Sequence, residues 1–525
     1  MAFLYTFTGE DKYAARAWKE LEEICSWPDW HPGHFLDTGE LSYGVSLAYD
    51  WCYDYFTPEQ RKTIEDALHR NAVMDGIGAY NGTTDKMDSG THNRSGWTKA
   101  TTNWNAVCNA GLLMASAAIA NVYPEDCTTL FGHIIKSVEL GVKDYAPDGG
   151  YAEGPGYWEY GTTYLVWLIA SMDSAFGTNY GLYEWPGVST TQYYAAYVDG
   201  PTGTFNYSDS GSGHLDGTSS FWFAKKNGDP DLAGLRYNKL IENGGGASPK
   251  DVIWYDPDNI STRVELGSDR LFKGIDTAFF RTNWTDSSMV FAGFHGGKNN
   301  SNHGNLDVGT FVLDAEGERW FIDLGGDSYS LPDYFGAAGR GTYYRGRAEG
   351  QNTVCVNPDK KADQVYTARG RITDYVSKPK GAYAIMDMKS ALSVLKVSDA
   401  KRGMLFTNNR RAVVVQDEMT LLEPGEVWWF AHTQADIEIA PDGKSAVLTQ
   451  NGKRMRAVIT SDNDAKFTVM DAVKLPTSPA THELENKNAG IRKLAIHLTG
   501  VKDVNLAVTF RMLDEGESEP SYRCV

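Results

Sequence analysis

The 525-residue sequence lacks the signatures of several common protein classes. Its six cysteines are scattered without a CxxC pair, which disfavours a zinc knuckle or a disulfide framework and predicts free core thiols. No apolar run is long enough to span a bilayer. The start has no basic segment followed by a long apolar core, so no signal peptide is predicted. A cytoplasmic location is expected, or a periplasmic or secreted one if the sequence is part of a longer chain.

Positive charge is also scarce, because 49 Lys and Arg face 68 Asp and Glu and leave a net charge of −19. Such a chain repels nucleic acid and anionic membranes at long range, so neither is expected as a partner. A Gly-rich phosphate loop, a GxSxG elbow and an HExxH helix are all missing. Aromatic residues are plentiful at 12%, which suits a large core or stacking on sugars. The sequence makes no prediction of oligomeric state.

The first half of the chain has the pattern of helices joined by long polar loops. Tyr13, Ala17, Leu21 and Ile24 recur at helical spacing, and further helices are predicted at 41–55, 58–74, 105–120, 128–145 and 155–172. The segment 105–120 is apolar almost all round, as in a buried inner helix. The Gly-rich loops 76–102 and 202–219 are expected to line a site. Paired helices with long loops at one end predict an incomplete (α/α) toroid.

Beyond residue 250 the pattern changes to short alternating runs typical of strands. Examples are 277–281, 289–294, 309–313, 319–323, 412–416 and 506–510. We therefore predict a multidomain α+β chain, with a toroid domain at 1–245 and an antiparallel β-sandwich at 255–525.

Three segments carry polar residues in unusual combinations. They are 101–109 (TTNWNAVCN), 147–161 (PDGGYAEGPGYWEYG) and 302–314 (NHGNLDVGTFVLD), the last followed by RWFIDLG at 319–325. Together, and in this order, they resemble the heparinase II/III-like polysaccharide lyases and the related exolytic alginate lyases. The resemblance covers most of the chain. It implies an (α/α) toroid followed by an antiparallel β-sandwich, and β-elimination beside a uronate carboxylate on an anionic poly- or oligosaccharide.

That reaction needs a group that neutralises the carboxylate, a base for the C5 proton and an acid for the departing O4. By resemblance Asn105 would neutralise the carboxylate, with Asn103 as the alternative; either amide could instead cap a buried helix. Tyr157 would be the proton shuttle, and Tyr160, one helical turn later, is the rival. His303 would act as a second base or a carboxylate clamp. The weaker histidine candidate is His295.

Further residues are expected to bind the substrate because they lie in or beside these motifs. Arginine forks suit carboxylate or sulfate groups, and tryptophan rings suit sugar faces. The candidates are His92, Arg94, Trp97, Lys99, Trp104, Glu153, Trp158, Lys298, Arg340, Arg345 and Arg347.

Several family members hold a metal in the sandwich, where this chain has Asn305, Asp323 and Gln351. Two histidines are thus replaced by amides, which are poor zinc ligands. We expect no required cofactor, and either no metal or a weakly bound divalent ion with oxygen ligands. Thr102 replaces a histidine of some relatives, which leaves the substrate preference open.

Two other functions fit parts of the sequence. An inverting glycoside hydrolase on the same toroid would use a pair of carboxylates from Asp37, Asp148, Glu153 and Glu159. A non-catalytic glycan-binding protein would have kept the fold and lost catalysis.

Overall fold

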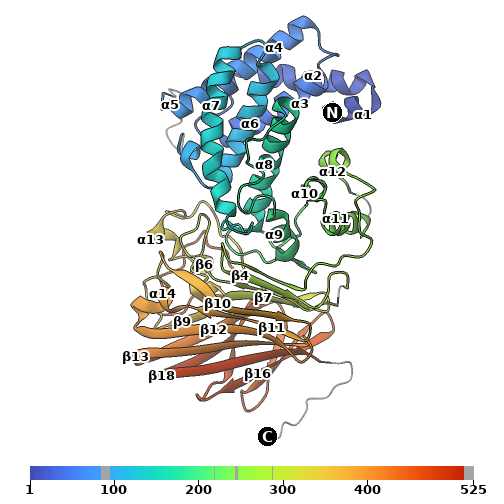
Figure 1. Ribbon diagram of the computed structural model, residues 1–525. Helices are drawn as coiled ribbons and strands as arrows, with labels where there is room; N and C mark the ends of the chain where they lie inside the picture. The colour runs from blue at the N-terminus through green and yellow to red at the C-terminus, as the bar shows by residue number, and fades with distance from the viewer. Residues whose placement is uncertain (84–94, 218, 243–245, 287, 514–525) are drawn as a thin grey trace. The chain divides into compact units, whose positions relative to one another are not determined.

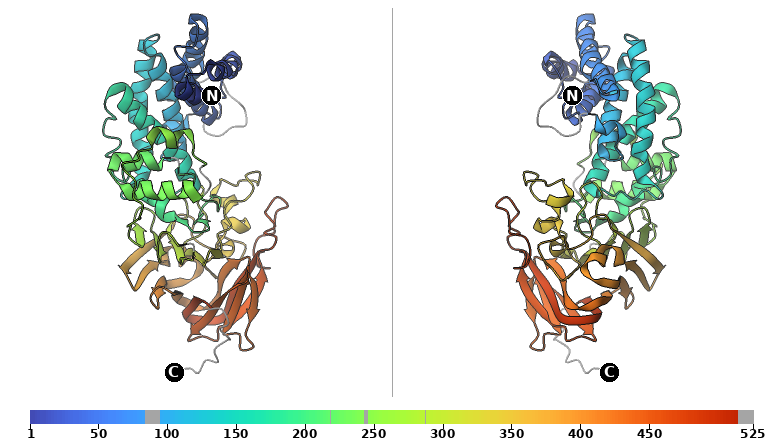
Figure 2. Two further views of the ribbon diagram at one scale, coloured as in Figure 1. Left: turned by 90° about the vertical axis from the view of Figure 1, so that its right-hand side faces the viewer. Right: turned by 90° about the vertical axis from the view of Figure 1, so that its left-hand side faces the viewer.

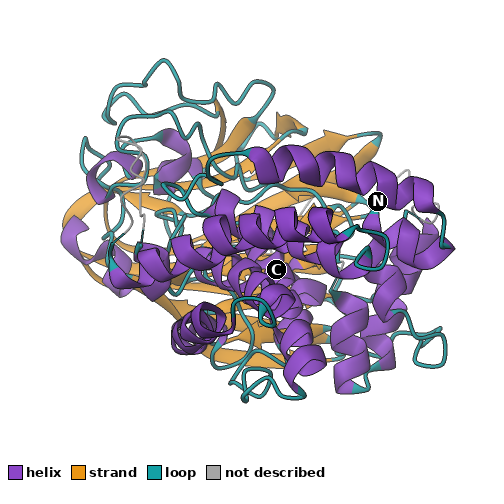
Figure 3. Cartoon of the chain, turned by 90° about the horizontal axis from the view of Figure 1, so that it is seen from above, coloured by secondary structure: helices purple, strands orange, loops and turns teal. Residues whose placement is uncertain are grey.

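The computed structural model describes residues 1–83, 95–217, 219–242, 246–286 and 288–513 (Figure 1). The chain forms two compact units. The helical unit comprises 1–149, 157–192 and 217–261, and the sandwich unit comprises 150–156, 193–216 and 262–525. Figure 3 distinguishes the helices from the strands. None of the described helices has the length and apolar character needed to cross a membrane.

The helical unit is built from pairs of long helices. The helices up to residue 149 are α1 (Ala2–Thr8), α2 (Asp11–Ser26), α3 (Leu36–Trp51), α4 (Pro58–Leu68), η1 (His69–Met74), α5 (Asp75–Asn81), η2 (Gly96–Lys99), α6 (Asn103–Ile119), α7 (Pro124–Gly141) and η3 (Val142–Tyr145). Those that follow are α8 (Pro155–Phe176), α9 (Thr191–Val198), α10 (Ser220–Asn227), α11 (Pro230–Glu242) and α12 (Pro249–Trp254). The last residues of α9 and the first of α8 belong to the sandwich unit.

Local sequence explains where these helices begin. A capping box between Thr57 and Gln60 and a proline in the first turn start α4. Helix α6 is buried on nearly every side, as its apolar sequence predicts. It packs closely on α3, because a Cβ added to Gly111 would lie only 2.0 Å from the carbonyl oxygen of Gly39. These glycines bring the two backbones into direct contact.

The sandwich unit contains a small hairpin and two larger antiparallel sheets. The hairpin is β1 (Asp199–Gly200) with β2 (Gly203–Thr204). A five-stranded sheet has the order β3 (Asp269–Phe272), β4 (Thr277–Arg281), β5 (Phe291–His295), β7 (Thr310–Ala315) and β8 (Glu318–Phe321). Short helices α13 (Ala337–Arg340), η4 (Tyr344–Gly346), η5 (Ala348–Gly350), α14 (Lys389–Leu392) and η6 (Ser393–Leu395) interrupt the strands.

The larger sheet has 11 strands, coloured mainly orange to red in Figure 2. Its main path is β14 (Asp436–Ile439), β15 (Ser445–Gln450), β16 (Lys453–Ser461), β18 (Arg492–Met512), β13 (Ala412–Thr433), β12 (Val397–Thr407), β11 (Gly381–Asp387), β10 (Arg369–Lys378) and β6 (Gly297–Lys298). Strands β17 (Phe467–Asp471) and β9 (Val354–Val356) pair with β18 and β13. Burial alternates along β12, as expected for a strand with one face on a core.

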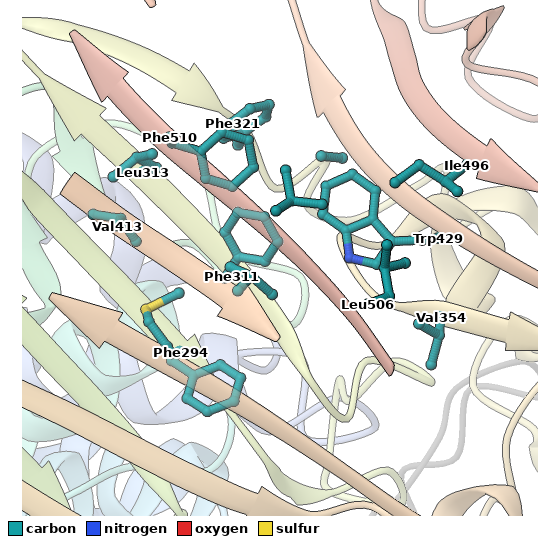
Figure 4. Close-up of a cluster of buried hydrophobic side chains, with 14 of the residues drawn as sticks. Phe294, Phe311, Leu313, Phe321, Val354, Val413, Trp429, Ile496, Leu506 and Phe510 are labelled. Carbon is teal, nitrogen blue, oxygen red and sulfur yellow. The ribbon is translucent and has the colours of Figure 1, made fainter. Parts of the chain in front are cut away.

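The core of the sandwich unit joins the two larger sheets. Phe294 and Phe311 of the smaller sheet lie in the same buried cluster as Val413, Trp429 and Phe510 of the larger one (Figure 4). This packing defines a β-sandwich. The two segments that it recruits from the helical half, 150–156 and 193–216, fall inside the range predicted as toroid. They join the sandwich because their backbone bonds to its strands: Arg281 donates to the carbonyls of Tyr197 and Asp199.

Candidate functional site

His303 and Asp209 form the centre of a polar cluster in the sandwich unit. His303 lies in the loop between β6 and β7 with a left-handed φ of 59°, and Asp209 lies in the recruited segment. The His303 Nδ1 is 3.0 Å from the Asp209 Oδ2. Only 1% of the Asp209 side chain and 8% of the His303 side chain are exposed. A left-handed non-glycine residue is uncommon and is often held so for function.

Arg340 braces this pair from the other side. Its Nη1 and Nη2 donate to the two carboxylate oxygens of Asp209 at 3.0 and 2.6 Å, and its Nη2 also donates to the His303 carbonyl at 2.7 Å. Burial opposes ionisation of Asp209, but the hydrogen bonds from His303 and Arg340 outweigh it and lower the pKa of Asp209. An ionised Asp209 favours the His303 tautomer that carries its proton on Nδ1.

Aromatic rings flank the imidazole. The Tyr329 ring stacks near His303 at a centroid distance of 6.1 Å, and Phe335 meets it edge-on at 5.7 Å. These two rings are 49% and 53% exposed, which is high for large aromatic side chains. Tyr334 instead anchors the cluster, since its hydroxyl donates to Asp209 at 2.9 Å. Exposed aromatic faces beside a polar centre suit the apolar faces of sugar rings.

Glu153 ties the neighbouring loop to this cluster. It accepts hydrogen bonds from the Asn302 amide at 2.7 Å and the Tyr151 hydroxyl at 3.1 Å, and it is 1% exposed. Gly154 nearby has a φ of 90°, and a Cβ there would lie 2.6 Å from the Tyr207 carbonyl. Glu153, predicted to contact substrate, is buried and holds the loop that carries His303 through its bond with Asn302.

The residues matched to metal ligands, Asn305, Asp323 and Gln351, are all buried. Among the described residues, Asp323 Oδ2, Gln351 Oε1 and Asp307 Oδ2 have no hydrogen-bond partner. Burial raises the pKa of Asp323 to about 7, and burial together with the Asp323 charge raises that of Asp307.

The Asn305 oxygen is already engaged, because it accepts from Arg340 at 2.8 Å. The unengaged oxygens of Asp307, Asp323 and Gln351 therefore fit a hard, oxygen-ligated cation better than zinc. No step of the reaction proposed below is routed through such an ion.

The predicted arginines have different roles. Arg340 belongs to the His303 cluster. Arg345 is partly buried and donates to the carbonyls of Leu324 and Gly326 at 2.7 and 2.8 Å. Arg347 is fully buried and bonds Glu349, Asp363 and several carbonyls. Arg345 and Arg347, both predicted to bind substrate, thus form hydrogen bonds within the sandwich unit. Lys298 is exposed.

Asn105 lies in the first turn of α6 in the helical unit. It is fully buried, and its Nδ2 donates to the carbonyls of Trp97 and Ser137 at 3.3 and 3.1 Å. Asn103 is 1% exposed. The bonds of Asn105 fix the segment before α6 to α7, which is a structural use of both amide hydrogens.

The two tyrosine candidates lie on α8 and differ in their surroundings. Tyr157 is partly exposed. Tyr160 donates to Glu40 Oε1 at 2.5 Å, and burial followed by this hydrogen bond raises the pKa of Tyr160. Tyr160 therefore holds its proton at neutral pH and is poorly suited as the base.

The remaining candidates divide by exposure. Trp97 and Trp158, both predicted to bind substrate, are 0% and 2% exposed, and Trp158 Nε1 donates to Thr191 at 2.7 Å. Trp104 is partly exposed and Lys99 is exposed. His295 is a core histidine, stacked on Tyr207 at 4.2 Å. His92 and Arg94 lie outside the described residues.

The described cysteines, Cys25, Cys52, Cys108, Cys127 and Cys355, are free and buried, which confirms the prediction for that part of the chain. Sequence reasoning missed Asp209, Tyr329 and Phe335. It marked 202–219 as a site-lining loop, but no spacing within that loop singled out Asp209 as the partner of a histidine 94 residues later.

Comparison with known proteins identifies the class of this architecture. Residues 272–506 match the sequence family described as heparinase II/III-like, C-terminal. The crystal structure of heparan sulfate lyase HepC from Pedobacter heparinus aligns with a TM-score of 0.66 at 12% identity, over 98% of this chain and 75% of that chain. A heparinase III crystal structure aligns with a TM-score of 0.67 at 12% identity, over the same shares. A search of the curated proteins gave no match.

These solved structures, at such low identity, define the fold, which is the predicted helical toroid followed by an antiparallel β-sandwich. With the match of the family sequence to the sandwich, they confirm the resemblance seen in the motifs. Residues 272–506 are thus similar to the heparinase II/III-like C-terminal family, and the aligned structures show the same fold over nearly the whole chain.

Proposed function

We propose that the chain is a polysaccharide lyase that cleaves a uronic-acid-containing glycan by β-elimination and leaves an unsaturated uronyl product. The observation that carries the proposal is the His303–Asp209–Arg340 cluster, whose histidine lies in the third motif. A histidine oriented by a buried carboxylate is suited to accept a proton from a weakly acidic carbon. The names of the aligned structures favour a glycosaminoglycan, while alginate and glucuronan present the same reacting unit.

The residue roles follow from the surroundings of each group. Tyr157 is proposed as the proton shuttle, since the phenol of Tyr160 is held by Glu40. His303 is proposed to take the C5 proton of the opposite epimer or to clamp the carboxylate. The neutralising amide is proposed to be Asn105 or Asn103. The Asn105 Nδ2 also donates to the carbonyls of Trp97 and Ser137, so a change at Asn105 affects the fold as well.

Two observations bear on the two other functions. Of the carboxylates that a hydrolase could use, Glu153 does not suit an accessible general acid, because it is 1% exposed and accepts two hydrogen bonds. A non-catalytic binding protein would have no need for a histidine whose tautomer is set by a buried carboxylate.

Ultraviolet absorbance during incubation with a panel of uronic-acid glycans tests the proposal. Elimination creates a C4=C5 double bond conjugated to the carboxylate, which absorbs where substrate and hydrolysis products do not. We expect a rise with at least one glycan, and its loss in Tyr157→Phe. New reducing ends without any rise would favour the hydrolase, and binding without turnover the non-catalytic protein.

A further inference from the structure

The segment before α3 brings two imidazoles and a carboxylate to one point. His31 Nδ1 and His34 Nδ1 lie 2.9 and 2.7 Å from the same oxygen, Oδ2 of Asp37. One ligand atom from each residue lies within 4.8 Å of the others. Within the described ranges, this is the one group of three or more His, Cys, Asp or Glu side chains with that spacing.

The chain holds this segment in an unusual backbone conformation. His31 and Phe35 have left-handed φ values of 59° and 67°, which cost conformational energy for residues other than glycine. Neighbouring core contacts maintain them. Trp30 and Phe35 are buried, and the Thr38 hydroxyl donates to the Trp30 carbonyl at 2.6 Å. The three polar side chains are thus carried on a turn with an anchored backbone.

The cluster is open to solvent on one side. The side chains of His31, His34 and Asp37 are 46%, 36% and 48% exposed. On the other side, the His34 ring meets Trp104 edge-on at a centroid distance of 4.8 Å. An ion from solution can therefore reach the ligand atoms, and Trp104 limits the movement of one imidazole.

Other histidine–aspartate pairs in the described part of the chain lack this convergence. His69 Nε2 lies 2.8 Å from Asp126, and His214 Nδ1 lies 2.7 Å from Asp199, each with a single imidazole. Each of these pairs offers only two ligand atoms to an ion. In the His31–His34–Asp37 group, two imidazole nitrogens lie within hydrogen-bonding distance of the same carboxylate oxygen. The three ligand atoms therefore lie close to one point in space.

We propose that His31, His34 and Asp37 bind one divalent transition-metal ion of the zinc type. Imidazole nitrogen suits zinc, copper and nickel, whereas calcium and magnesium favour oxygen ligands alone. Ligand atoms around a tetrahedral zinc are separated by roughly 3.3 Å, given bonds of about 2.0–2.1 Å. The present separations of 2.7 and 2.9 Å reach that value with a shift of about half an ångström. Three protein ligands leave a fourth position for water or an anionic group.

The test is a calorimetric titration of the untagged, chelator-treated protein with zinc chloride alone. The visible spectrum of the cobalt form is the second readout. We expect saturable binding of one ion per chain by the wild-type protein. His34→Ala and Asp37→Asn should weaken binding at least about 10-fold and change the cobalt spectrum. The matched control is His69→Ala, which removes an imidazole from a single pair and should bind as wild type.

Two results would overturn the proposal. The first is no saturable zinc binding by the wild-type protein. The second is unchanged affinity in both His34→Ala and Asp37→Asn, which would place the ion elsewhere. Asp37→Asn preserves the shape of the side chain, and the wild-type cobalt spectrum reports imidazole ligands even if His34→Ala does not fold. The readouts do not depend on glycan cleavage, so they stand or fall separately from the lyase proposal.

Discussion

The imidazole of His303 is oriented by Asp209, whose Oδ2 lies 3.0 Å from its Nδ1. Because this hydrogen bond fixes the tautomer of His303, Asp209→Asn should reverse that tautomer or loosen the orientation of the ring. The substitution preserves the shape of the side chain at position 209. If His303 takes a proton, we expect kcat on the best glycan to fall by roughly 100-fold or more. Asp399→Asn, an exposed change on β12, is the matched control. Wild-type kcat in Asp209→Asn would remove His303 from the proton transfer.

The same carboxylate should contribute to stability in a pH-dependent way. The folded-state pKa of Asp209 is lowered, so its stabilising effect is full above the unfolded pKa of about 3.9 and is lost as the pH falls through the folded value. At pH 7, Asp209→Asn leaves Arg340 without its buried partner, which should cost about 3–5 kcal/mol. In urea unfolding, the difference in free energy of unfolding between the wild-type protein and Asp209→Asn should decrease below pH 4. A difference that is constant from pH 7 to 3 would contradict it.

Substitutions of Tyr157 and Tyr160, both on α8, should lower the rate of glycan cleavage to different extents. The phenol of Tyr160 is hydrogen-bonded to Glu40, and its pKa is raised by burial and by that bond. We therefore expect Tyr160→Phe to retain much more activity than Tyr157→Phe in the absorbance assay. Equal loss in both variants, with unchanged melting temperatures, would return Tyr160 to the proton transfer.

Asn105 should behave as a structural residue. Asn105→Ala removes the donor to the carbonyls of Trp97 and Ser137, which should destabilise the helical unit by about 1–3 kcal/mol. Asn121→Ala, at an exposed position, should leave stability unchanged. Thermal unfolding monitors both changes. A large loss of kcat at an unchanged melting temperature would instead support Asn105 as the amide that neutralises the carboxylate.

Arg347 provides a test of whether a buried arginine of this region binds substrate or stabilises the fold. It is buried between Glu349 and Asp363, so Arg347→Met leaves buried carboxylates without their cation and should cost about 3–5 kcal/mol. Arg371→Met, exposed on β10, is the control. Measured on folded protein, KM for the glycan should be unchanged in Arg347→Met. An increase in KM without loss of stability would restore a substrate contact.

Sequence periodicity predicted the order of the elements well, because apolar spacing is a local property. Helix α6 (Asn103–Ile119) nearly matches the predicted 105–120, and α8 begins at the predicted Pro155. The burial of single aromatic residues was harder to predict from the sequence. Trp97, Trp104 and Trp158 lie in similar polar motifs, yet only Trp104 remains partly exposed, and that outcome depends on distant contacts such as Thr191 with Trp158.

The same limit applies to polar partners. His303 was recognisable from its motif, whereas Asp209 becomes its neighbour only because 193–216 folds with the strands. Hydrogen bonds of this kind join residues far apart in the chain, and one sequence carries no local trace of them. The cluster His31–His34–Asp37 was not predicted from the sequence, because the convergence of its side chains depends on left-handed backbone at His31 and Phe35.

The direct backbone contact between Gly39 of α3 and Gly111 of α6 fixes the distance between these two helices. Gly39 lies two residues after Asp37, and Gly111 lies seven residues after Trp104 on α6. A methyl group at Gly111 would push α6 away from α3 and with it shift Trp104 relative to His34. Glycine at both positions therefore fixes how His34 and Trp104 are placed relative to each other. A substitution at either glycine would change that placement.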